Sequence, residues 1–388
     1  MRLRHPDGSV VHLAYCSNVH PAEDLEGIHD QLRRFAGPVR AELGVDRLGL
    51  GLWLPAAAAG LLAADRGELD ALRRVLDEQG LEVVTLNAFP YGGFHAPVVK
   101  HRVYRPDWTE AERLDFTLDA ATVLAGLLPE DATRGSVSTL PLAWHTPWSA
   151  AEATGARVNL DRLATGLARL RDRTGRTVRV GFEPEPGCVV ETTHDAVREL
   201  AGIDTEHLGV CVDTAHLATA FEEPAEAMGR LADAGLPVVK AQLSAALHVA
   251  DPADPSSRAL LAEFVEDRFL HQVREPTSSG VVGRDDLPGA LTGEPLPADG
   301  PWRVHFHLPL HSAPRPPLGS TTESLAASAG ALVGGEHPLT DHLEVETYTW
   351  AVLPPDQRPA DDAGLVAGIA AELRHARGAL HSLGLEDA

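Results

Sequence analysis

The stretch TVRVGFEPEPG, residues 177–187, shows the fold most clearly, because an alternating apolar run ends there in glutamates and prolines. Two runs of the same kind follow it, HLGVCVDTAHLA at residues 207–218 and PVVKAQLSAAL at 237–247. The segments between them, DAVRELAGI at 195–203 and PAEAMGRLADAG at 224–235, have helical patterns. Short β-rich runs that alternate with helical patterns are typical of βα units around a parallel sheet. We therefore expect an α/β protein.

The same rhythm extends over almost the whole chain of 388 residues. Six more strand-like segments are VVHLAYC (10–16), RLGLGLWL (47–54), LEVVTLNAF (81–89), GSVSTLPL (135–142), WRVHFHLPLH (302–311) and HLEVETYTW (342–350). A closed (β/α)8 TIM barrel needs eight strands, so nine segments indicate an insertion or a strand added at the barrel mouth. Because no linker, internal repeat or composition break is visible, we predict a single TIM-barrel domain over residues 1–388. Its surplus length lies in a long loop at 90–108 and an insertion at about 248–300.

The composition limits the partners of the protein. Lys and Arg number 33 against 56 Asp and Glu, which gives a net charge of −23. A surface that acidic repels phosphate backbones and anionic lipids, so we expect no nucleic acid partner. The most apolar run, residues 52–64, is too short to span a bilayer, and the three cysteines have no CxxC spacing. We expect a cytoplasmic protein without a transmembrane segment that acts on a small-molecule metabolite.

Several motifs with a known chemistry are absent from the sequence. It contains no GxxxxGK[ST], no GxGxxG after a strand, no GxSxG and no HExxH. NTP hydrolysis, dinucleotide redox chemistry and serine hydrolase chemistry are therefore disfavoured.

Polar side chains gather where the predicted strands end, which is where barrels of this kind carry their chemistry. They are Asn18, His20, Asn87, Glu183, Glu185, Asp213, His216, Gln242, His305, His307 and Glu346. Period-two alternation places Lys240 and Gln242 on one strand face, and His305 and His307 on one face of another strand. Oxygen and nitrogen ligands that converge from several strands are what a divalent metal needs, so Zn²⁺, Mn²⁺ and Mg²⁺ are all admissible.

Each of these residues also has a structural explanation. A glutamate in a turn, such as Glu183, is often solvated, and an aspartate before a helix, such as Asp213, is commonly an N-cap. His216 and His305 could each be a packed core histidine. Glu346 is the strongest candidate, because a glutamate within LEVET is hard to bury without a cation.

Lys100 and Lys240 are the only lysines in a chain that otherwise uses arginine. Lysine offers a compact ammonium group whose pKa shifts readily, so either residue could bind an anionic or carbonyl oxygen. Lys240 points the same way as Gln242 and is therefore a candidate catalytic residue.

The runs FEPEPG, CVDTAHLA, VVKAQLS and LEVETY resemble the xylose isomerase-like barrels, which include sugar phosphate isomerases and epimerases and endonuclease IV. The resemblance implies a metal site with Glu183, Asp213 followed by His216, a histidine at position 242, and Glu346. This chain has Gln242 at that position. Either the metal preference differs, or His305 or His307 fills the vacancy, or the metal is lost.

More narrowly, eight runs together resemble the EboE family of metabolite-traffic proteins. They are YCSNVHPAEDLEGIHDQLRRF, GLGLWLP, NAFPYGGFH, VYRPDW, FEPEPG, CVDTAH, HFHLPLH and LEVETYTW. This resemblance implies a bacterial gene cluster for a secondary-metabolite precursor, and contact with other proteins of that cluster.

The residues and the resemblance together define the predicted site. The predicted metal ligands are Glu183, Asp213, Gln242, Glu346 and His307. The predicted catalytic residues are Glu183, Glu346, His305 and Lys240. The predicted substrate-binding residues are Asn18, His20, Asn87, His95 and His216.

Two classes of function fit this site. The first is a metal-dependent isomerase, epimerase or lyase for a small polyhydroxy or carbonyl metabolite, with the loop from Tyr91 to Trp108 as a lid. The second is a non-catalytic metabolite-binding or carrier protein on the same barrel, which the change at Gln242 favours. The acidic charge argues against a DNA-repair nuclease.

Overall fold

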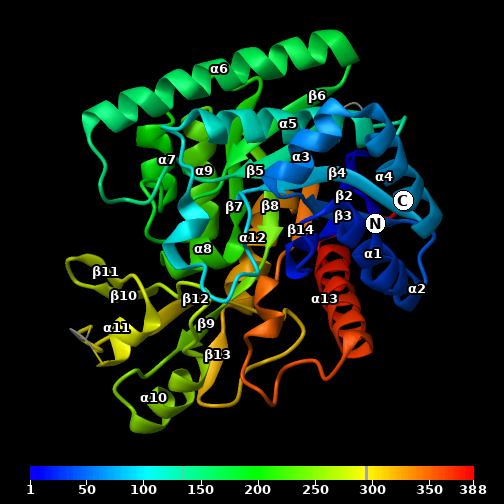
Figure 1. The fold of residues 1–388 in the computed structure, drawn as a ribbon. Helices are drawn as coiled ribbons and strands as arrows, with labels where there is room; N and C mark the ends of the chain where they lie inside the picture. The colour runs from blue at the N-terminus through cyan, green and yellow to red at the C-terminus, as the bar shows by residue number, and fades with distance from the viewer. Residues whose placement is uncertain (133, 293–295) are drawn as a thin grey trace.

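Eight parallel strands form a closed barrel in the computed structural model, which describes residues 1–132, 134–292 and 296–388 (Figure 1). They are β2 (Val10–Cys16), β3 (Leu48–Trp53), β4 (Leu81–Ala88), β5 (Arg134–Thr139), β6 (Thr177–Phe182), β7 (Leu208–Asp213), β8 (Val238–Leu243) and β14 (His342–Val345). The last strand, β14, pairs in parallel with both β8 and β2 and so closes the barrel. The predicted TIM-barrel fold is confirmed.

Helices surround the barrel and bury their apolar faces against the strands. They are α1 (Leu25–Gln31), α2 (Gly37–Leu43), α3 (Ala56–Ala64), α4 (Arg66–Gln79), α5 (Ala111–Leu127), α6 (Ala150–Thr174), α7 (Thr193–Glu199), α8 (Thr214–Thr219), α9 (Pro224–Asp233), α12 (Thr322–Val333) and α13 (Asp362–Ser382). Within the described residues, no helix combines the length and the apolar character needed to cross a membrane.

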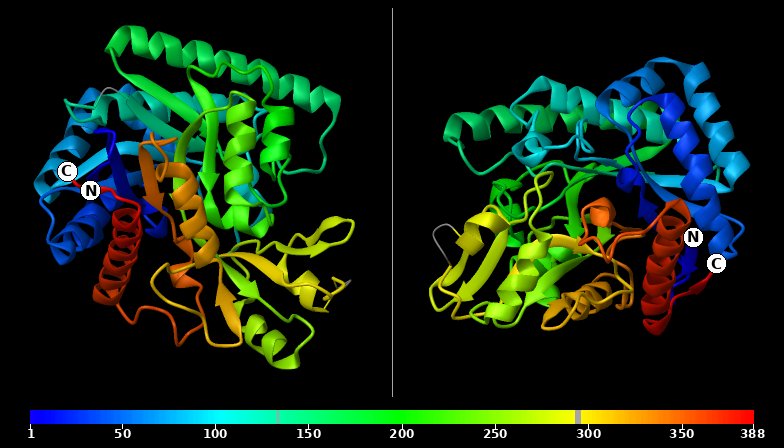
Figure 2. Two further views of the ribbon diagram at one scale, coloured as in Figure 1. Left: turned by 180° about the vertical axis from the view of Figure 1, so that it is seen from behind. Right: turned by 60° about the horizontal axis from the view of Figure 1, so that its bottom comes forward.

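The two chain termini lie side by side at the amino-terminal end of the barrel strands (Figure 2). Two short strands, β1 (Arg2–Arg4) and β15 (Glu386–Asp387), pair there, and β1 also pairs with β2. This contact joins the first and last segments of the chain at the end of the barrel that we call the floor.

A second, antiparallel sheet lies at the opposite end, below the barrel in Figure 1. Its strands are β9 (Ala245–Val249), β10 (Val273–Thr277), β11 (Gly280–Arg284), β12 (Trp302–Leu308) and β13 (Leu318–Ser320), in the order β11-β10-β12-β9-β13. Two short helices, α10 (Pro255–Leu261) and α11 (Leu287–Thr292), accompany it. The ninth strand-like segment of the sequence is therefore β12, in a sheet added at the mouth, and the added strands span residues 245–320.

Charged side chains fill one layer of the barrel interior. Lys240 on β8 and Glu344 on β14 are fully buried and form an ion pair. Room for Glu344 depends on Gly51 of β3, because a Cβ atom at that position would stand 1.4 Å from Glu344 Oε1. The predicted inward face of β8 is thus occupied by Lys240, one layer below the mouth.

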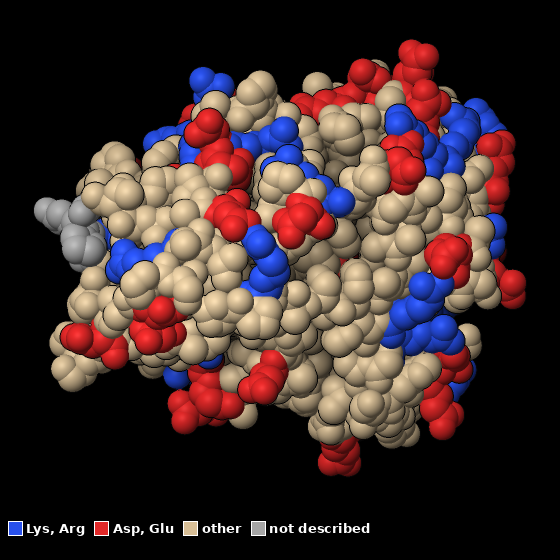
Figure 3. Space-filling view, turned by 90° about the horizontal axis from the view of Figure 1, so that it is seen from below, with Lys and Arg blue, Asp and Glu red and all other residues tan. Residues whose placement is uncertain are grey.

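The side of the molecule that carries the second sheet is not uniformly charged. Figure 3, which views the molecule from this side, shows lysines and arginines in small groups between acidic side chains. No broad basic surface of the kind that follows a phosphate backbone is visible on this face.

Candidate active site

A cavity of about 50 Å³ lies between the mouth of the barrel and the second sheet. Strand ends supply Asn18, Asn87, Glu183, Glu185, His216 and Glu346 to its wall, and β12 supplies His305 and His307. The loop after β4 adds Phe89, Phe94, Lys100 and Tyr104, while Phe269 and Tyr348 complete the apolar part. The cavity therefore combines one strongly polar side with one aromatic side.

Three buried carboxylates meet at this mouth, from Glu183 after β6, Asp213 at the end of β7 and Glu346 after β14. We call them the mouth carboxylates. Burial and the repulsion between these groups raise the pKa of Glu183 and of Glu346 well above the ordinary value. Among the described residues, their ion-pair partners are histidines, with no lysine or arginine in contact. The mouth thus gathers carboxylates that, within the described part of the chain, are in contact with no lysine or arginine.

Asp213 has two roles at once. Its Oδ1 atom accepts hydrogen bonds from the backbone N–H groups of Ala215 and His216, at 2.8 and 2.9 Å, and from Ser244 Oγ at 2.7 Å. Its Oδ2 atom is buried without a hydrogen-bond partner. Asp213 can therefore cap α8 with Oδ1 and still offer Oδ2 as a metal ligand.

Two asparagines orient Glu346. Asn18 Nδ2 and Asn87 Nδ2 donate to Glu346 Oε1 at 2.7 and 3.0 Å, and both come from the N-terminal quarter of the chain. Both line the cavity as predicted, and their amide groups hold one oxygen of the carboxylate in place.

His307 joins the mouth carboxylates from the second sheet. Its Nδ1 atom lies 2.8 Å from the backbone oxygen of Glu346, which can only accept, so Nδ1 carries the hydrogen. The Nε2 atom has no hydrogen-bond partner and lies 3.9 Å from Asp213 Oδ2, and one ligand atom each of His307, Asp213 and Glu346 lies within 4.8 Å of the others. Burial lowers the pKa of His307 to about 4, so its imidazole is neutral and can act as a ligand.

His216 and His305 form the other side of the polar wall, with their rings in T-shaped contact and their Nε2 atoms 2.9 Å apart. Glu185 lies beside them, with Oε2 3.4 Å from His216 Nε2. Burial raises the pKa of Glu185 to about 7, although His216 and Tyr104 act in the opposite direction.

Five predicted residues do not line this cavity, and Asp213, described above, is one of them. His20 packs behind it, with its ring stacked on Phe35 and its Nε2 3.2 Å from the Tyr15 hydroxyl. His95 lies in the loop wall, with Nε2 2.7 Å from the backbone oxygen of Asn18. Lys240 lies in the ion pair below, and Gln242 is buried with both side-chain polar atoms unpartnered.

Three cavity residues that carry a carboxylate or a hydroxyl group were not among the predicted site residues. Glu185 follows the same strand end as Glu183, and a glutamate in such a turn is often exposed to solvent. Tyr104 lies within the loop that the sequence marks as a lid, and its hydroxyl donates to Glu185 Oε1 at 3.1 Å. Tyr348 follows Glu346 by two residues, and only this proximity could have indicated it.

The lid segment is fastened to the second sheet. The N–H groups of Val99 and Lys100 both donate to the carbonyl of Arg268 at 2.8 Å. Lys100 Nζ donates to the carbonyl of Phe269 at 2.6 Å and to Asp286 Oδ2 at 2.7 Å. Lys100 thus closes the cavity wall with its ammonium group already paired.

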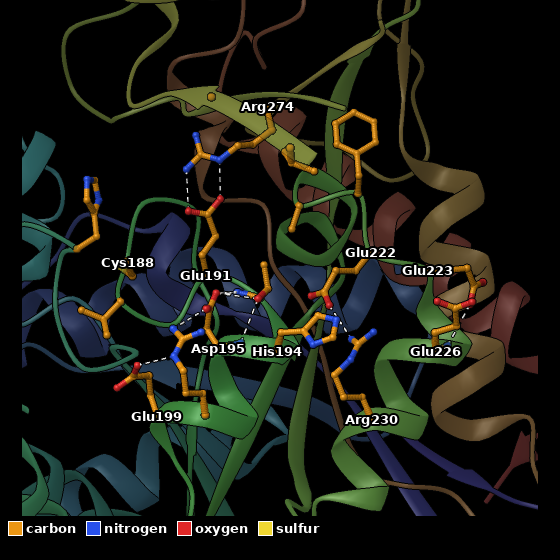
Figure 4. Close-up of a pocket in the computed structure, with 18 of the residues that line it drawn as sticks. Cys188, Glu191, His194, Asp195, Glu199, Glu222, Glu223, Glu226, Arg230 and Arg274 are labelled. Atoms are coloured by element: carbon orange, nitrogen blue, oxygen red, sulfur yellow. Dashed lines mark hydrogen bonds and ion pairs between the residues drawn. The ribbon is translucent and has the colours of Figure 1, made fainter. Parts of the chain in front are cut away.

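A wider pocket of about 920 Å³ lies outside the mouth. Figure 4 shows that its charged side chains point toward one another rather than into free space. The pairs are Arg274 with Glu191, Arg230 with Glu222, and Arg198 with Asp195 and Glu199. Because each of these arginines already holds a carboxylate, we regard the smaller cavity as the chemical site.

A parallel barrel that gathers carboxylates and histidines at its carboxyl mouth defines a TIM barrel with a candidate metal centre. The family described as "Xylose isomerase-like TIM barrel" matches residues 40–286 of this sequence. The chain belongs to this family, which confirms the broader of the two resemblances. No curated protein matches the sequence.

Solved structures with a similar fold include a protein from Anabaena variabilis named as a candidate sugar phosphate isomerase/epimerase. It has 15% identity and a TM-score of 0.52, with 97% of this chain and 100% of that chain covered. A xylose isomerase-like TIM barrel protein from Mycobacterium smegmatis, in complex with magnesium, has 15% identity and a TM-score of 0.51 over 95% and 98% of the chains. D-allulose 3-epimerase from Methylomonas sp. has 12% identity and a TM-score of 0.49 over 95% and 98%. At these identities the likeness concerns the fold alone.

Proposed function

We propose that the protein is a metal-dependent enzyme of the sugar isomerase and epimerase kind, acting on a small polyhydroxy or carbonyl metabolite. The observation that carries this proposal is the group of three buried mouth carboxylates without a lysine or arginine partner. Buried charge of one sign is costly unless a counter-charge binds, and a divalent cation supplies one. Membership of the xylose isomerase-like family supports the proposal.

The side chains at the mouth fit such a cation. Glu183 Oε2, Asp213 Oδ2 and His307 Nε2 are buried atoms without a hydrogen-bond partner. With Glu346 they form a carboxylate and imidazole donor set that suits Zn²⁺, Mn²⁺ or Mg²⁺. In this proposal His307, from the added sheet, takes the place that the resemblance gives to a histidine at position 242. When bound, the cation polarises the adjacent oxygen atoms of the substrate.

Glu183 and Glu346 move the proton in this proposal. Glu183 would hold the cation with one carboxylate oxygen and accept a proton with the other from the carbon beside the substrate carbonyl. Glu346, held by Asn18 and Asn87, returns a proton either to the neighbouring carbon or to the opposite face of the same carbon. Burial raises the pKa of both groups, which brings acid and base forms closer to neutral pH.

The lid must move to admit a substrate. A cavity of about 50 Å³ holds a cation and about one water molecule, whereas small-molecule sites usually measure about 300 Å³ or more. The loop from Tyr91 to Trp108 supplies Phe94 and Tyr104 to the aromatic wall and is the segment that can open the cavity. Once closed, it would exclude water from the reaction.

The narrower resemblance suggests a setting for this activity. We propose an EboE-like role in a bacterial metabolite-traffic pathway, with contacts to proteins of the same gene cluster. A non-catalytic binding or carrier protein is the second candidate. Gln242 favours it, because both of its polar side-chain atoms are buried and unpartnered where the resemblance expects a histidine ligand.

Solvent deuterium uptake tests the proposed chemistry. The protein, supplied in turn with Zn²⁺, Mn²⁺ or Mg²⁺, is incubated in D₂O with a panel of sugars, sugar phosphates and keto acids. We expect carbon-bound deuterium to enter at least one substrate, and Glu183→Gln to lower the rate at least about 10²-fold. Glu78→Gln, an exposed change of the same kind, should have no effect. No uptake together with ligand-induced thermal stabilisation would instead support the carrier.

A further inference from the structure

Three of the proposed metal ligands belong to the barrel, whereas His307 belongs to the second sheet. Glu183, Asp213 and Glu346 end or follow barrel strands, and His307 lies on β12. The distance from His307 to the carboxylates therefore depends on contacts between the two sheets, and the pairing of the barrel strands does not set it. One buried side chain behind the cavity makes such contacts.

This side chain is Glu372 on α13, which is 2% exposed and does not line the cavity. Its Oε1 atom accepts hydrogen bonds from the backbone N–H of Leu310 at 3.1 Å and from the Thr347 hydroxyl at 2.6 Å. Its Oε2 atom accepts from the indole N–H of Trp350 at 3.2 Å. One carboxylate thus holds three donors from two segments of the chain.

Two of these donors lie next to proposed metal ligands. Leu310 follows His307 by three residues, just after β12, and Thr347 directly follows Glu346, just after β14. Glu372 therefore connects the carboxyl end of a strand in the second sheet with the carboxyl end of a strand in the barrel.

The same two segments also bond to each other. His307 Nδ1 donates to the backbone oxygen of Glu346 at 2.8 Å, and the Thr349 hydroxyl donates to the backbone oxygen of His307. The ring of Tyr348, which lines the cavity, has its centroid 4.8 Å from that of His307. Because Glu372 accepts from both segments, these contacts form one hydrogen-bonded unit behind the mouth.

The surface of α13 is shaped to receive Trp350. Gly368 lies one turn before Glu372 on the same face of the helix. A Cβ atom at Gly368 would stand 2.6 Å from Trp350 Cη2. Glycine destabilises a helix interior relative to alanine, so the helix loses stability to accommodate the indole ring. The ring then lies against the helix, and its N–H reaches Glu372 Oε2.

This bonding pattern requires a carboxylate. The backbone N–H of Leu310 and the indole N–H of Trp350 can only donate, and they reach different oxygens of Glu372. A glutamine would turn its amide NH₂ group toward one of these two donors. Burial raises the pKa of Glu372 to about 7, although the three hydrogen bonds lower it. A carboxyl group that is unfavourable to bury indicates a role beyond packing.

We propose that Glu372 is a positioning residue of the mouth site, which holds Glu346 and His307 at the spacing that a shared cation requires. It acts through Thr347 and Leu310 and contacts neither the cation nor the substrate. The proposal rests on the proposed function, because the cation at the mouth carboxylates is what the two ligands share. Replacing a group that orients a metal ligand from outside typically changes metal affinity by about 10–100-fold.

Cobalt binding tests this role without any knowledge of the substrate. Chelator-treated full-length protein is titrated with Co²⁺ at a temperature where circular dichroism shows each variant to be folded. The dissociation constant and the visible spectrum of the bound ion are recorded. We expect Glu372→Leu to weaken binding about 10–100-fold and to change the spectrum, because His307 no longer keeps its place beside Glu346. The matched control is Glu82→Gln, at a glutamate buried in the floor beside Arg2, which should leave affinity and spectrum unchanged.

Milder variants keep the test informative if Glu372→Leu fails to fold. Glu372→Gln keeps the acceptor for Leu310 and Thr347 but not the one for Trp350, so its cobalt affinity should lie between those of the wild type and the leucine variant. Thr347→Val removes one donor and should also weaken binding. Adding Trp350→Phe to Glu372→Gln removes the indole N–H that faces the amide and should restore part of the affinity. A purely structural role would lower the unfolding free energy of these variants and leave the affinity of the folded protein unchanged.

The outcomes also separate this proposal from the proposed function. Wild-type affinity and spectrum in Glu372→Leu, or in both milder single variants if the leucine variant does not fold, overturn the positioning role and leave the mouth site intact. An equal loss of affinity in Glu82→Gln also overturns it, because the effect would then follow stability alone. No bound cobalt in the wild type contradicts the mouth site, and the positioning role with it.

Discussion

The two ends of the barrel pair their carboxylates in opposite ways. At the floor, Glu82 accepts hydrogen bonds from Arg2 Nε and Nη2 at 3.0 and 2.9 Å, and Arg134 pairs with Asp341 at 2.6 Å. At the mouth, Glu183, Asp213 and Glu346 are as deeply buried, yet no lysine or arginine of the described residues pairs with them. The floor pairs its carboxylates with arginines, whereas among the described residues the mouth carboxylates have only histidines as ion-pair partners.

The pKa values of the carboxylates follow this difference. Burial acts to raise the pKa of Glu82, but hydrogen bonds from His12 and Arg2 lower it to about 2. At Glu346, burial and the charges of Asp213 and Glu344 act in the same direction and raise the pKa. Buried carboxylates with an arginine contribute to stability, and those without one are more typical of function. Substitutions at three depths of the barrel test whether its carboxylates differ in their effect on stability.

The largest effect is expected between the two ends, at Lys240. Lys240→Met leaves the fully buried Glu344 without its cation, and such a loss costs about 3–5 kcal/mol of unfolding free energy. Urea denaturation measures it. The double change Lys240→Met with Glu344→Leu should recover most of the loss, because it removes both charges. A single variant as stable as the wild type would show that the pair is not a structural element.

The second largest change in unfolding free energy is expected at the floor. Glu82→Gln removes a carboxylate whose pKa falls from 4.5 to about 2 on folding, which corresponds to at most about 3 kcal/mol of stability. Because the pKa is lowered, this stability is present above about pH 4.5 and is lost as the pH falls toward 2. Unfolding free energies of wild type and variant should therefore differ at pH 7 and converge in acid. A constant difference would contradict the ion-pair account.

The smallest effect, and one of opposite sign, is expected at the mouth. In chelator-treated protein, Glu346→Gln removes a charge that repels Asp213 and Glu344, and should raise the unfolding free energy by about 1–2 kcal/mol. The amide oxygen can still accept from Asn18 and Asn87. Thermal melting at pH 7 measures the change, with Glu78→Gln as the neutral control. Destabilisation would mean that Glu346 is a structural residue like Glu82.

Much of this architecture could be predicted from the sequence, because strand periodicity and strand ends are local features. The eight barrel strands and the extra HFH strand follow from alternation, and Glu183, Asp213 and Glu346 follow from their positions directly after apolar runs. How deep a side chain lies in the barrel, and toward which neighbours it points, are not local features of the sequence. Lys240 lies on the predicted face but one layer too deep, and His20 follows a strand end yet packs against Phe35 behind the cavity.

The contacts behind His305 were also beyond prediction, among them Gln272 Oε1 at 2.7 Å from His305 Nδ1. Gln272 and Tyr104 are 168 residues apart, and neither belongs to a strand end of the barrel. Their connection depends on how the second sheet and the lid loop pack over the mouth. No periodicity in either segment specifies that packing.

The most direct test of the central claim is the thermal stability of chelator-treated protein with and without added Mn²⁺, Mg²⁺ or Zn²⁺. If the mouth carboxylates bind a cation, at least one of these ions at about 100 times its Kd should stabilise the wild type by about 2.7 kcal/mol. Glu346→Gln should lose most of this stabilisation, and Glu82→Gln should keep it. The absence of any shift in the wild type, or an equal shift in Glu346→Gln, would contradict the account.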